Sequence, residues 1–469
     1  MTPTPAKPNI LIIYSDQHRY DCIGANGHPQ VQTPNMDRLA REGANFSHAF
    51  TPIPMCVPAR CSMLTGQWPS QHGVIFNFDG ETFKRLDPNL PTAPGTLQQA
   101  GYHCIHVGRW HVDPQRKPLD FGFHDYVPDW RYGKWRRMQE IPSSSPENPE
   151  KGERFAYTDE HAKPEESGLA WNAGQTINWI ERMQDEPDPF FIRWHCMEPH
   201  LVCKPPEPYA SMYDPKSLKP WPGFGDQFEN KPYIQKQMLK NWDIEGWTWD
   251  DWAPVAAKYL GVISLLDHEI GRVLDTLDRL GIAENTLVIY TSDHGDMCGS
   301  HGMVDKHYNM YDDIVRVPMI MRWPGKIPAG TQVEDFVSNA IDIPTTICAA
   351  AGAEVPDSFQ GENLLIPATQ KGSIKREDIF ASYSGNQFGS YSVRMLRDRR
   401  YKYVWNATAQ DELYDLDSDP GELKNRIDDP ELRDELVRLR ARLAAWMEAT
   451  DDTLHNRFIR RQLLENAKL

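Results

Sequence analysis

The 469-residue sequence contains no apolar run that approaches the roughly 20 residues of a membrane-spanning helix. Its mean hydropathy of -0.62 and its 25% of charged residues are typical of a soluble globular chain. The N-terminal stretch MTPTPAKPNILIIYSDQ offers only a short apolar run, whereas a secretory signal needs about 7 to 15 apolar residues. We therefore expect a cytoplasmic protein with no membrane partner.

Cysteine is scarce and is scattered along the chain without paired short spacings. This pattern excludes a disulfide framework and a thiolate-rich zinc ribbon, and it indicates a reducing compartment. The eight cysteines are Cys22, Cys56, Cys61, Cys104, Cys196, Cys203, Cys298 and Cys348.

Basic residues are outnumbered, with 50 Lys and Arg against 66 Asp and Glu, for a formal charge of -16. A nucleic-acid partner needs a basic face, so this class of function is excluded. An anionic substrate would need a local cluster of cations to overcome the overall field of the protein.

The chain is too long for one compact core of ordinary size, which predicts two domains. Over residues 1–370, continuous apolar runs alternate with amphipathic segments, which predicts an α/β domain with a mixed, mostly parallel sheet flanked by helices. The alternating segments are strands at 9–15, 103–108, 190–198 and 286–292, and helices at 34–43 and 255–281.

Two segments, 126–168 and 201–254, interrupt this alternation and are rich in Pro, Trp, Tyr and charge. They are expected to be irregular insertions that form the rim of a pocket. Eight of the 15 tryptophans lie between 171 and 252. These aromatic rings could stack on a sugar or aryl group, or they could simply pack a loop-rich cap.

Residues 371–469 have a different pattern, in which short strand-like segments precede one charged helix. This order predicts a small C-terminal α+β domain with an antiparallel sheet. No internal repeat is apparent.

Chemically useful side chains lie at or just after four predicted strand ends: Asp16, Arg109, His200 and Asp293. In α/β sheets, ligands gather at the carboxyl ends of the strands. Four distant segments are therefore expected to meet in one cleft.

Two pairs at these strand ends combine oxygen and imidazole donors. Asp16 is followed by Gln17, and Asp293 is followed by His294. The mixture suits a hard or intermediate divalent cation. Each pair is also compatible with an ordinary turn carboxylate and a loop histidine.

Five cationic or titratable residues could give the cleft a positive charge. They are Arg60, Arg109, His111, His200 and Lys306. A metal with cations around a nucleophile is typical of sulfuryl or phosphoryl transfer. A surface lysine at 306 and a structural ion pair at Arg60 are the alternatives.

The motif CVPAR at 56–60 resembles the C-x-P-x-R signature of the type I, formylglycine-dependent sulfatases, which belong to the alkaline phosphatase superfamily. The resemblance runs in order from residue 8 to about 426 and implies an alkaline-phosphatase-like fold. The further matching segments are PNILIIYSDQ, MLTGQWPSQHGV, GRWH, MEPH, TSDHGDMCGSHG, VRVPMIMRWPG and ELYDLDSDPGELKN.

The resemblance implies that a formylglycine-generating enzyme oxidises Cys56 to formylglycine, guided by Pro58 and Arg60. The aldehyde then forms a geminal diol, of which one hydroxyl attacks sulfur while the alcohol leaves. Loss of a proton from the second hydroxyl releases sulfate, so no water need attack the ester.

The resemblance also implies a role for each site residue. Arg60 would hold the diol, Lys306 and His200 would bind the oxyanion, and His200 would be the acid for the leaving alcohol. His111 would be the base for the second hydroxyl, and Arg109 and Asn77 would bind substrate. The implied metal ligands are Asp16, Gln17, residue 56, Asp293 and His294.

Three of the implied site residues depart from the usual family pattern, as do Ala59 and Gln67 outside the C-x-P-x-R core. Gln17 replaces a second Asp, His294 an Asn, and Arg109 a Lys. With one carboxylate fewer, the site is less anionic, which favours Mn²⁺ over Ca²⁺ as its divalent ion. The Asp-Gln and Asp-His pairs also resemble those of phosphonate monoester and phosphodiester hydrolases.

Three functions therefore stay open: a sulfatase, which the sequence favours, a phosphonate monoester or phosphodiester hydrolase, and a non-catalytic binding protein. For a sulfatase, the substrate would be a small-molecule or saccharide sulfate ester. The oligomeric state is open, and a homo-oligomer is compatible with the sequence.

Overall fold

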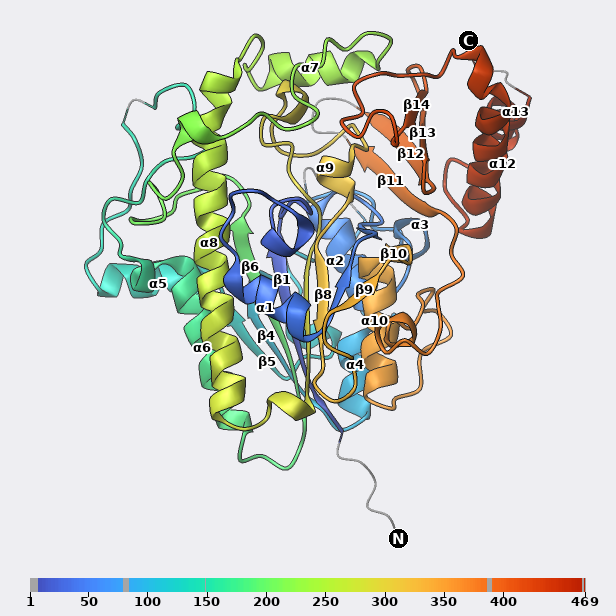
Figure 1. The fold of residues 1–469 in the computed structure, drawn as a ribbon. Helices are drawn as coiled ribbons and strands as arrows, with labels where there is room; N and C mark the ends of the chain where they lie inside the picture. The colour runs from blue at the N-terminus through green and yellow to red at the C-terminus, as the bar shows by residue number, and fades with distance from the viewer. Residues whose placement is uncertain (1–6, 79–83, 148, 386–389, 466–467, 469) are drawn as a thin grey trace.

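The structure is a computed structural model that describes residues 7–78, 84–147, 149–385, 390–465 and 468. Its centre is an eight-stranded sheet with the order β5-β4-β6-β1-β7-β8-β2-β9 (Figure 1). The strands are β1 (Asn9–Asp16), β2 (Ala44–Phe46), β4 (His103–Gly108), β5 (Asp125–Pro128), β6 (Phe190–Pro199), β7 (Thr286–Ser292), β8 (Met319–Arg322) and β9 (Thr331–Val333).

Five adjacent strands, from β5 to β7, run parallel, whereas β8 runs antiparallel to both of its neighbours. The expected mixed, mostly parallel sheet is therefore confirmed. A separate parallel pair joins β3 (Ala49–Phe50) to β10 (Val337–Ser338).

Helices cover both faces of the central sheet, with α6 and α8 on one side and α4 and α10 on the other (Figure 1). The helices of this region are α1 (Pro34–Glu42), α2 (Cys56–Thr65), α3 (Pro69–His72), α4 (Ala93–Gln99), α5 (Trp130–Met138), α6 (Gly168–Met183), α7 (Tyr233–Asn241), α8 (Trp249–Arg279), α9 (Asp312–Val315), α10 (Asn339–Ala350) and α11 (Leu365–Ala368).

The apolar run of β1 is continuous because both faces of this strand are buried. Ile10 and Ile12 belong to the core that contains α10, whereas Leu11 and Ile13 belong to the core that contains α8. Side chains alternate between the faces of a strand, so a two-sided core requires apolar residues at successive positions.

Helix α1 begins after Thr33 and ends before Gly43, as the sequence predicts. Glycine is required at 43 because a Cβ atom there would lie 2.1 Å from the carbonyl oxygen of Met321. The close approach lets β2 follow α1 directly and pair with β8.

Most of the two segments is irregular, as expected, but each also contains a regular helix. Helix α5 lies in 126–168, while α7 and the first turns of α8 lie in 201–254. Tertiary packing accounts for much of this order, since Trp247 and Trp252 pack against Phe155. Four of the clustered tryptophans, Trp194, Trp221, Trp247 and Trp252, are buried, which favours the packing role for them.

The C-terminal region forms an antiparallel sheet covered by helices, which confirms the expected α+β arrangement. The elements are β11 (Ile379–Gly385), β12 (Tyr391–Arg397), β13 (Tyr401–Asn406), β14 (Glu412–Asp415), α12 (Arg433–Ala449) and α13 (Arg457–Leu464). The sheet begins at Ile379, and a domain boundary between 370 and 371 stays a prediction.

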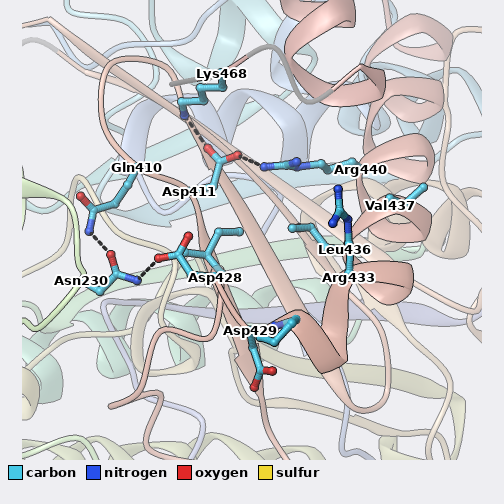
Figure 2. A pocket seen from close by; sticks show the side chains of 12 residues that line it. Asn230, Gln410, Asp411, Asp428, Asp429, Arg433, Leu436, Val437, Arg440 and Lys468 are labelled. Carbon is cyan, nitrogen blue, oxygen red and sulfur yellow. Dashed lines mark hydrogen bonds and ion pairs between the residues drawn. The ribbon is translucent and has the colours of Figure 1, made fainter.

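Figure 2 shows how segment 201–254 contacts the C-terminal region around a cavity of about 570 Å³. The side chain of Asn230 donates to Asp428 at 2.8 Å and accepts from Gln410 at 3.1 Å. Asp411 pairs with both Arg440, at 3.2 Å, and Lys468, at 2.5 Å. Most charges of this cavity are thus already paired within the protein.

A search of the described residues for bilayer-crossing helices gives none, since each helix is too short or too polar.

Candidate active site

The carboxyl ends of four neighbouring strands, β4, β6, β1 and β7, form one edge of the central sheet. In register, Asp16 is opposite Pro199 and Ser15 is opposite Ser292. The four strand-end residues Asp16, Arg109, His200 and Asp293 therefore lie at the same edge. This is the convergence that the sequence predicts.

Cys56 is the first residue of α2, a helix whose ten residues are all buried. Its Sγ lies 3.3 Å from Nε2 of His294 and 3.9 Å from Oδ1 of Asp16. The side chain amide oxygen of Asn77 accepts a 3.1 Å hydrogen bond from the N–H of Val57, in the first turn of this helix. The dipole of the helix favours negative charge near residue 56.

Four side chains converge on one point at this edge: Asp16, Cys56, Asp293 and His294. One ligand atom from each lies within 4.8 Å of all the others, and all four residues are buried. Backbone N–H groups of Gln17 and His294 fix Oδ1 of Asp293 at 3.0 and 2.9 Å. Two carboxylates and an imidazole are a donor set that fits a divalent cation.

The pKa directions of this cluster agree with a ligand role. Burial opposes ionisation of Asp16, but Arg60 and other nearby cations outweigh it and hold the pKa well below its usual value. Burial also lowers the pKa of His294, which keeps its imidazole neutral. The carboxylate and the neutral imidazole are the forms that coordinate metals.

The amide of Gln17 makes two hydrogen bonds beside this cluster. Its oxygen accepts from Nζ of Lys306 at 2.8 Å, and its nitrogen donates to Asp296. The amide thus holds Lys306 in place, and coordination of a metal by Gln17 stays a prediction.

Arg60 lies between the two carboxylates of the cluster. Its Nη2 is 2.5 Å from Oδ2 of Asp16 and 3.0 Å from Oδ2 of Asp293, and its Nη1 donates to Nδ1 of His111. Burial alone would lower the pKa of Arg60, but the two carboxylates raise it above its usual value. Arg60 is therefore a buried structural cation, and contact with the nucleophile stays a prediction.

His111 faces two guanidinium groups. Nδ1 accepts from Arg60 and lies 3.4 Å from Nη2 of Arg109, while Nε of Arg109 lies 3.6 Å from Asp16. Burial first, then Arg60 and Arg109, lowers the pKa of His111 to about 2. The imidazole is neutral, but its Nδ1 lone pair is occupied, so a role as base stays a prediction that requires release of Arg60.

His200 and Lys306 form a hydrogen-bonded pair. Nδ1 of His200 donates to the carbonyl of Leu201 at 2.5 Å, which leaves Nε2 to accept from Nζ of Lys306 at 3.1 Å. Burial opposes the charge of Lys306, but Asp305, 3.1 Å away, helps to raise its pKa above the ordinary value. Lys306 is therefore an ammonium group rather than the surface lysine of the alternative interpretation.

Sequence reasoning missed Asp296 and Asp305, two buried carboxylates in the loop after β7. Asp305 pairs with Lys306, and Asp296 accepts from Gln17. Burial, with Asp305 nearby, raises the pKa of Asp296 to about 6. The recurrence of Asp in DHGDMCGSHGMVDK, beside the expected site, was the available signal.

Two cations beside the cluster give the edge an anion-binding character: Arg109, whose Nε lies 3.6 Å from Oδ2 of Asp16, and Lys306, which donates to Gln17. A tetrahedral oxyanion ester placed here would meet both cations and a divalent metal. This chemistry, on an α/β sheet of this topology, defines a hydrolase of the alkaline phosphatase superfamily.

The sulfatase family model matches residues 8–353, and the model of the N-sulphoglucosamine sulphohydrolase C-terminal region matches residues 299–449. The chain belongs to the sulfatase family, within the type I sulfatases of that superfamily, and is a sulfuric ester hydrolase.

Individual relatives cover nearly the whole chain. An arylsulfatase of Clostridium perfringens is 30% identical, with 95% of each chain aligned. An N-acetylglucosamine-6-O-sulfatase of Bacteroides thetaiotaomicron is 26% identical over 89% of this chain and 82% of the relative. The solved phosphonate monoester hydrolase of Agrobacterium radiobacter is 26% identical, with a TM-score of 0.79 over 93% of this chain and 96% of that one.

Proposed function

We propose that the protein hydrolyses sulfate monoesters of small molecules or saccharides to alcohol and sulfate, with a formylglycine made from Cys56 and one divalent cation. The observation that carries the proposal is the buried convergence of Asp16, Cys56, Asp293 and His294 beside Lys306. Sulfatase relatives, including one named for a sulfated amino sugar, support the substrate class.

The metal would be held by Asp16, Asp293 and His294 together with residue 56, and Gln17 stands beside them. A hydrated formylglycine would supply the nucleophile, and the cation would supply Lewis acidity toward it and the ester. Two carboxylates, one imidazole and a neutral amide favour Mn²⁺, with Ca²⁺ as the alternative.

The protein groups have separate tasks in this reaction. Arg60 partly neutralises the two carboxylates and fixes their orientation. Arg109 and Lys306 bind ester oxygens, on which negative charge accumulates as the ester bond breaks. The proton between Nζ of Lys306 and Nε2 of His200, 3.1 Å apart, is available to the leaving alcohol oxygen.

Maturation requires a formylglycine-generating enzyme as a partner, because the thiol of Cys56 cannot form a hydrate. The proposal includes a cytoplasmic location, supported by eight free and buried cysteines.

A phosphonate monoester or phosphodiester hydrolase is the second candidate function. The likeness to the Agrobacterium radiobacter enzyme favours it, as does the neutral amide of Gln17 beside the metal cluster. Both candidates would use the same nucleophile, so substrate turnover must separate them.

Two measurements test the proposal on protein co-expressed with a formylglycine-generating enzyme. Mass spectrometry of the peptide that contains residue 56 should show an aldehyde in place of the thiol, and Cys56→Ala should be inactive. Aryl sulfate should be turned over with a larger kcat/KM than an aryl phosphonate ester. Full activity of an unmodified Cys56 would refute the nucleophile, and a preference for the phosphonate would refute the sulfatase assignment.

A further inference from the structure

A cavity of about 240 Å³ opens beside His200, the residue that is hydrogen-bonded to Lys306. Its walls come from both segments singled out in the sequence, 126–168 and 201–254, and from helices α6 and α8. The cavity therefore begins where the sulfate ester would be held, and it is placed to receive the alcohol part of the substrate.

One side of the cavity carries a carboxylate with unused hydrogen-bonding capacity. Glu198 lies on β6, two residues before His200, and its Oε2 is buried with no hydrogen-bond partner in the described part of the chain. A buried acceptor without a donor is costly and is rare in native proteins. Because Glu198 lines the cavity, a ligand there would meet its carboxylate as a hydrogen-bond acceptor.

The other side of the cavity is apolar and unusually exposed. Trp130, Met197 and Val202 are 65%, 41% and 38% exposed, and all three line the cavity. Exposed apolar side chains that gather at a concave site mark a binding surface rather than an ordinary protein surface. The indole of Trp130 offers a broad apolar face to a ligand.

The charges of the cavity disfavour a second anion. Asp129 and Glu198 line it, and the basic side chains among its lining residues in the described part of the chain are those of Lys204 and His200. A further lining carboxylate, Asp159, is already paired with Arg136, whose Nη2 donates to it at 2.9 Å. A second sulfate or a carboxylate bound here would meet Glu198 in a partly desolvated space.

We propose that this cavity binds the ring of a monosulfated neutral or amino sugar, which lays its C–H face on Trp130 and donates a hydroxyl or ammonium hydrogen to Glu198. This inference rests on the proposed function, because the sulfate of the same molecule must lie beside Lys306 and His200. Only the sugar satisfies both sides of the cavity.

The alcohol parts of other sulfate esters would fit only one of the two sides of the cavity. An aryl ring or a trialkylammonium group could pack on Trp130, but neither brings a hydrogen-bond donor to Glu198. A doubly sulfated sugar brings donors, but it also brings a second anion toward Asp129 and Glu198.

The test compares kcat/KM for five sulfate esters: 4-nitrophenyl sulfate, choline sulfate, glucosamine 3-sulfate, glucosamine 6-sulfate and glucosamine 2-N,6-O-disulfate. In the wild-type enzyme, one of the glucosamine monosulfates should have the highest value. Glu198→Gln should lower that value by about 10- to 100-fold, the worth of a charge-assisted hydrogen bond. Glu198→Gln should lower kcat/KM for 4-nitrophenyl sulfate less than it lowers kcat/KM for the sugar. It should also bring kcat/KM for the disulfate closer to that for the monosulfates.

Trp130→Ala provides a second variant that is unaffected by folding problems at a buried carboxylate, because Trp130 is exposed. It should lower kcat/KM for the sugar by roughly 2- to 10-fold, as expected for loss of an aromatic contact. Matched controls are Met138→Ala on the same helix, where the side chain is 71% exposed, and Glu165→Gln on the surface. Both controls should leave the ratio of sugar to aryl turnover unchanged.

The outcomes distinguish failure of the sugar site from failure of the proposed sulfatase function. Turnover of aryl sulfate without turnover of the monosulfated sugars, or a sugar-to-aryl ratio that neither variant changes, overturns the sugar site and leaves the sulfatase function intact. Turnover of aryl phosphonate in preference to every sulfate ester overturns the sulfatase function itself.

Discussion

The Nη2 of Arg60 lies 2.5 Å from Oδ2 of Asp16, and neither side chain has any exposed surface. The same nitrogen is 3.0 Å from Asp293, so one guanidinium group holds two carboxylates that would otherwise repel each other. Arg60 thereby assembles the candidate metal site before any cation binds.

Replacement of Arg60 by Met should make folding depend on the metal. Without divalent ions, the free energy of unfolding should fall by about 3–5 kcal/mol, because two buried carboxylates lose their partner. With saturating Mn²⁺ the loss should be smaller, since the cation takes over part of the neutralisation. Urea denaturation of Arg60→Met in EDTA and in Mn²⁺ measures both values.

The control for this experiment is Arg85→Met, which breaks a partly exposed ion pair with Asp113. Its cost should be much smaller and independent of the metal. If the loss in Arg60→Met were the same in EDTA and Mn²⁺, the interpretation of Arg60 as a substitute for part of the metal charge would be wrong.

Removal of the metal should lower both activity and thermal stability. A ligand that binds only the folded state at 100 times its Kd stabilises it by about 2.7 kcal/mol. Chelation should therefore reduce the Tm of the wild type. In Asp293→Asn the fall in Tm on chelation should be smaller, because this variant has lost one carboxylate of the cluster and binds the ion less tightly. Elemental analysis of the purified protein identifies the ion.

An equal Tm response of the wild type and Asp293→Asn would show that the ion which matters for stability binds elsewhere. Glu284→Gln, at a surface carboxylate just before β7 and so at the opposite end of that strand from Asp293, is the matched control and should respond like the wild type.

The backbone framework of the site could be predicted because it depends on local patterns. Strands buried on both faces leave continuous apolar runs, and the polar residues that end them, such as Asp16 and Asp293, must meet at one edge of a parallel sheet. Helix α5 has no regular apolar stripe and could not be predicted, because contacts with distant residues stabilise it.

The pairing of side chains within the site could not be predicted either. Whether the amide of Gln17 bonds Lys306 or a metal depends on the side-chain conformation of residues 289 positions apart in the sequence. The same holds for Glu198, whose unused oxygen is visible only once the cavity around it has formed. Motif spacing identifies the residue types, whereas their hydrogen bonds depend on tertiary structure.

The C-terminal sheet should depend strongly on Lys402 of β13. Its ammonium is fully buried and lies 2.6 Å from both Asp312 of α9 and Glu422. Lys402→Met leaves these carboxylates facing each other and should lower the free energy of unfolding by about 3–5 kcal/mol. Arg400→Met, which removes a 53% exposed partner of Asp415, should cost much less. Equal losses in the two variants, measured by urea denaturation, would contradict a dominant role for Lys402.

Acid should destabilise the protein through histidines that are buried in the neutral form, of which His72 is the clearest outside the active site. Burial first, and then Lys84, lowers the pKa of His72 to about 3, and its Nδ1 accepts from the N–H of Val74 at 3.1 Å. In the unfolded chain the pKa of histidine is about 6.5. Below this pH the unfolded chain takes up a proton that the folded protein does not, so stability is lost as the pH falls from about 6.5 toward 3.

His72→Gln removes this titration and so isolates it. The variant should carry a fixed cost from the altered contacts with Ser62 and Val74, whereas its stability relative to the wild type should improve by about 1.4 kcal/mol between pH 7.5 and pH 5.5. Urea denaturation at both pH values measures the change, and His161→Gln, at an exposed position, should show none. An offset between wild type and His72→Gln that is the same at both pH values would mean that the folded protein accommodates the proton on His72, and the acid sensitivity would then have to arise from other groups.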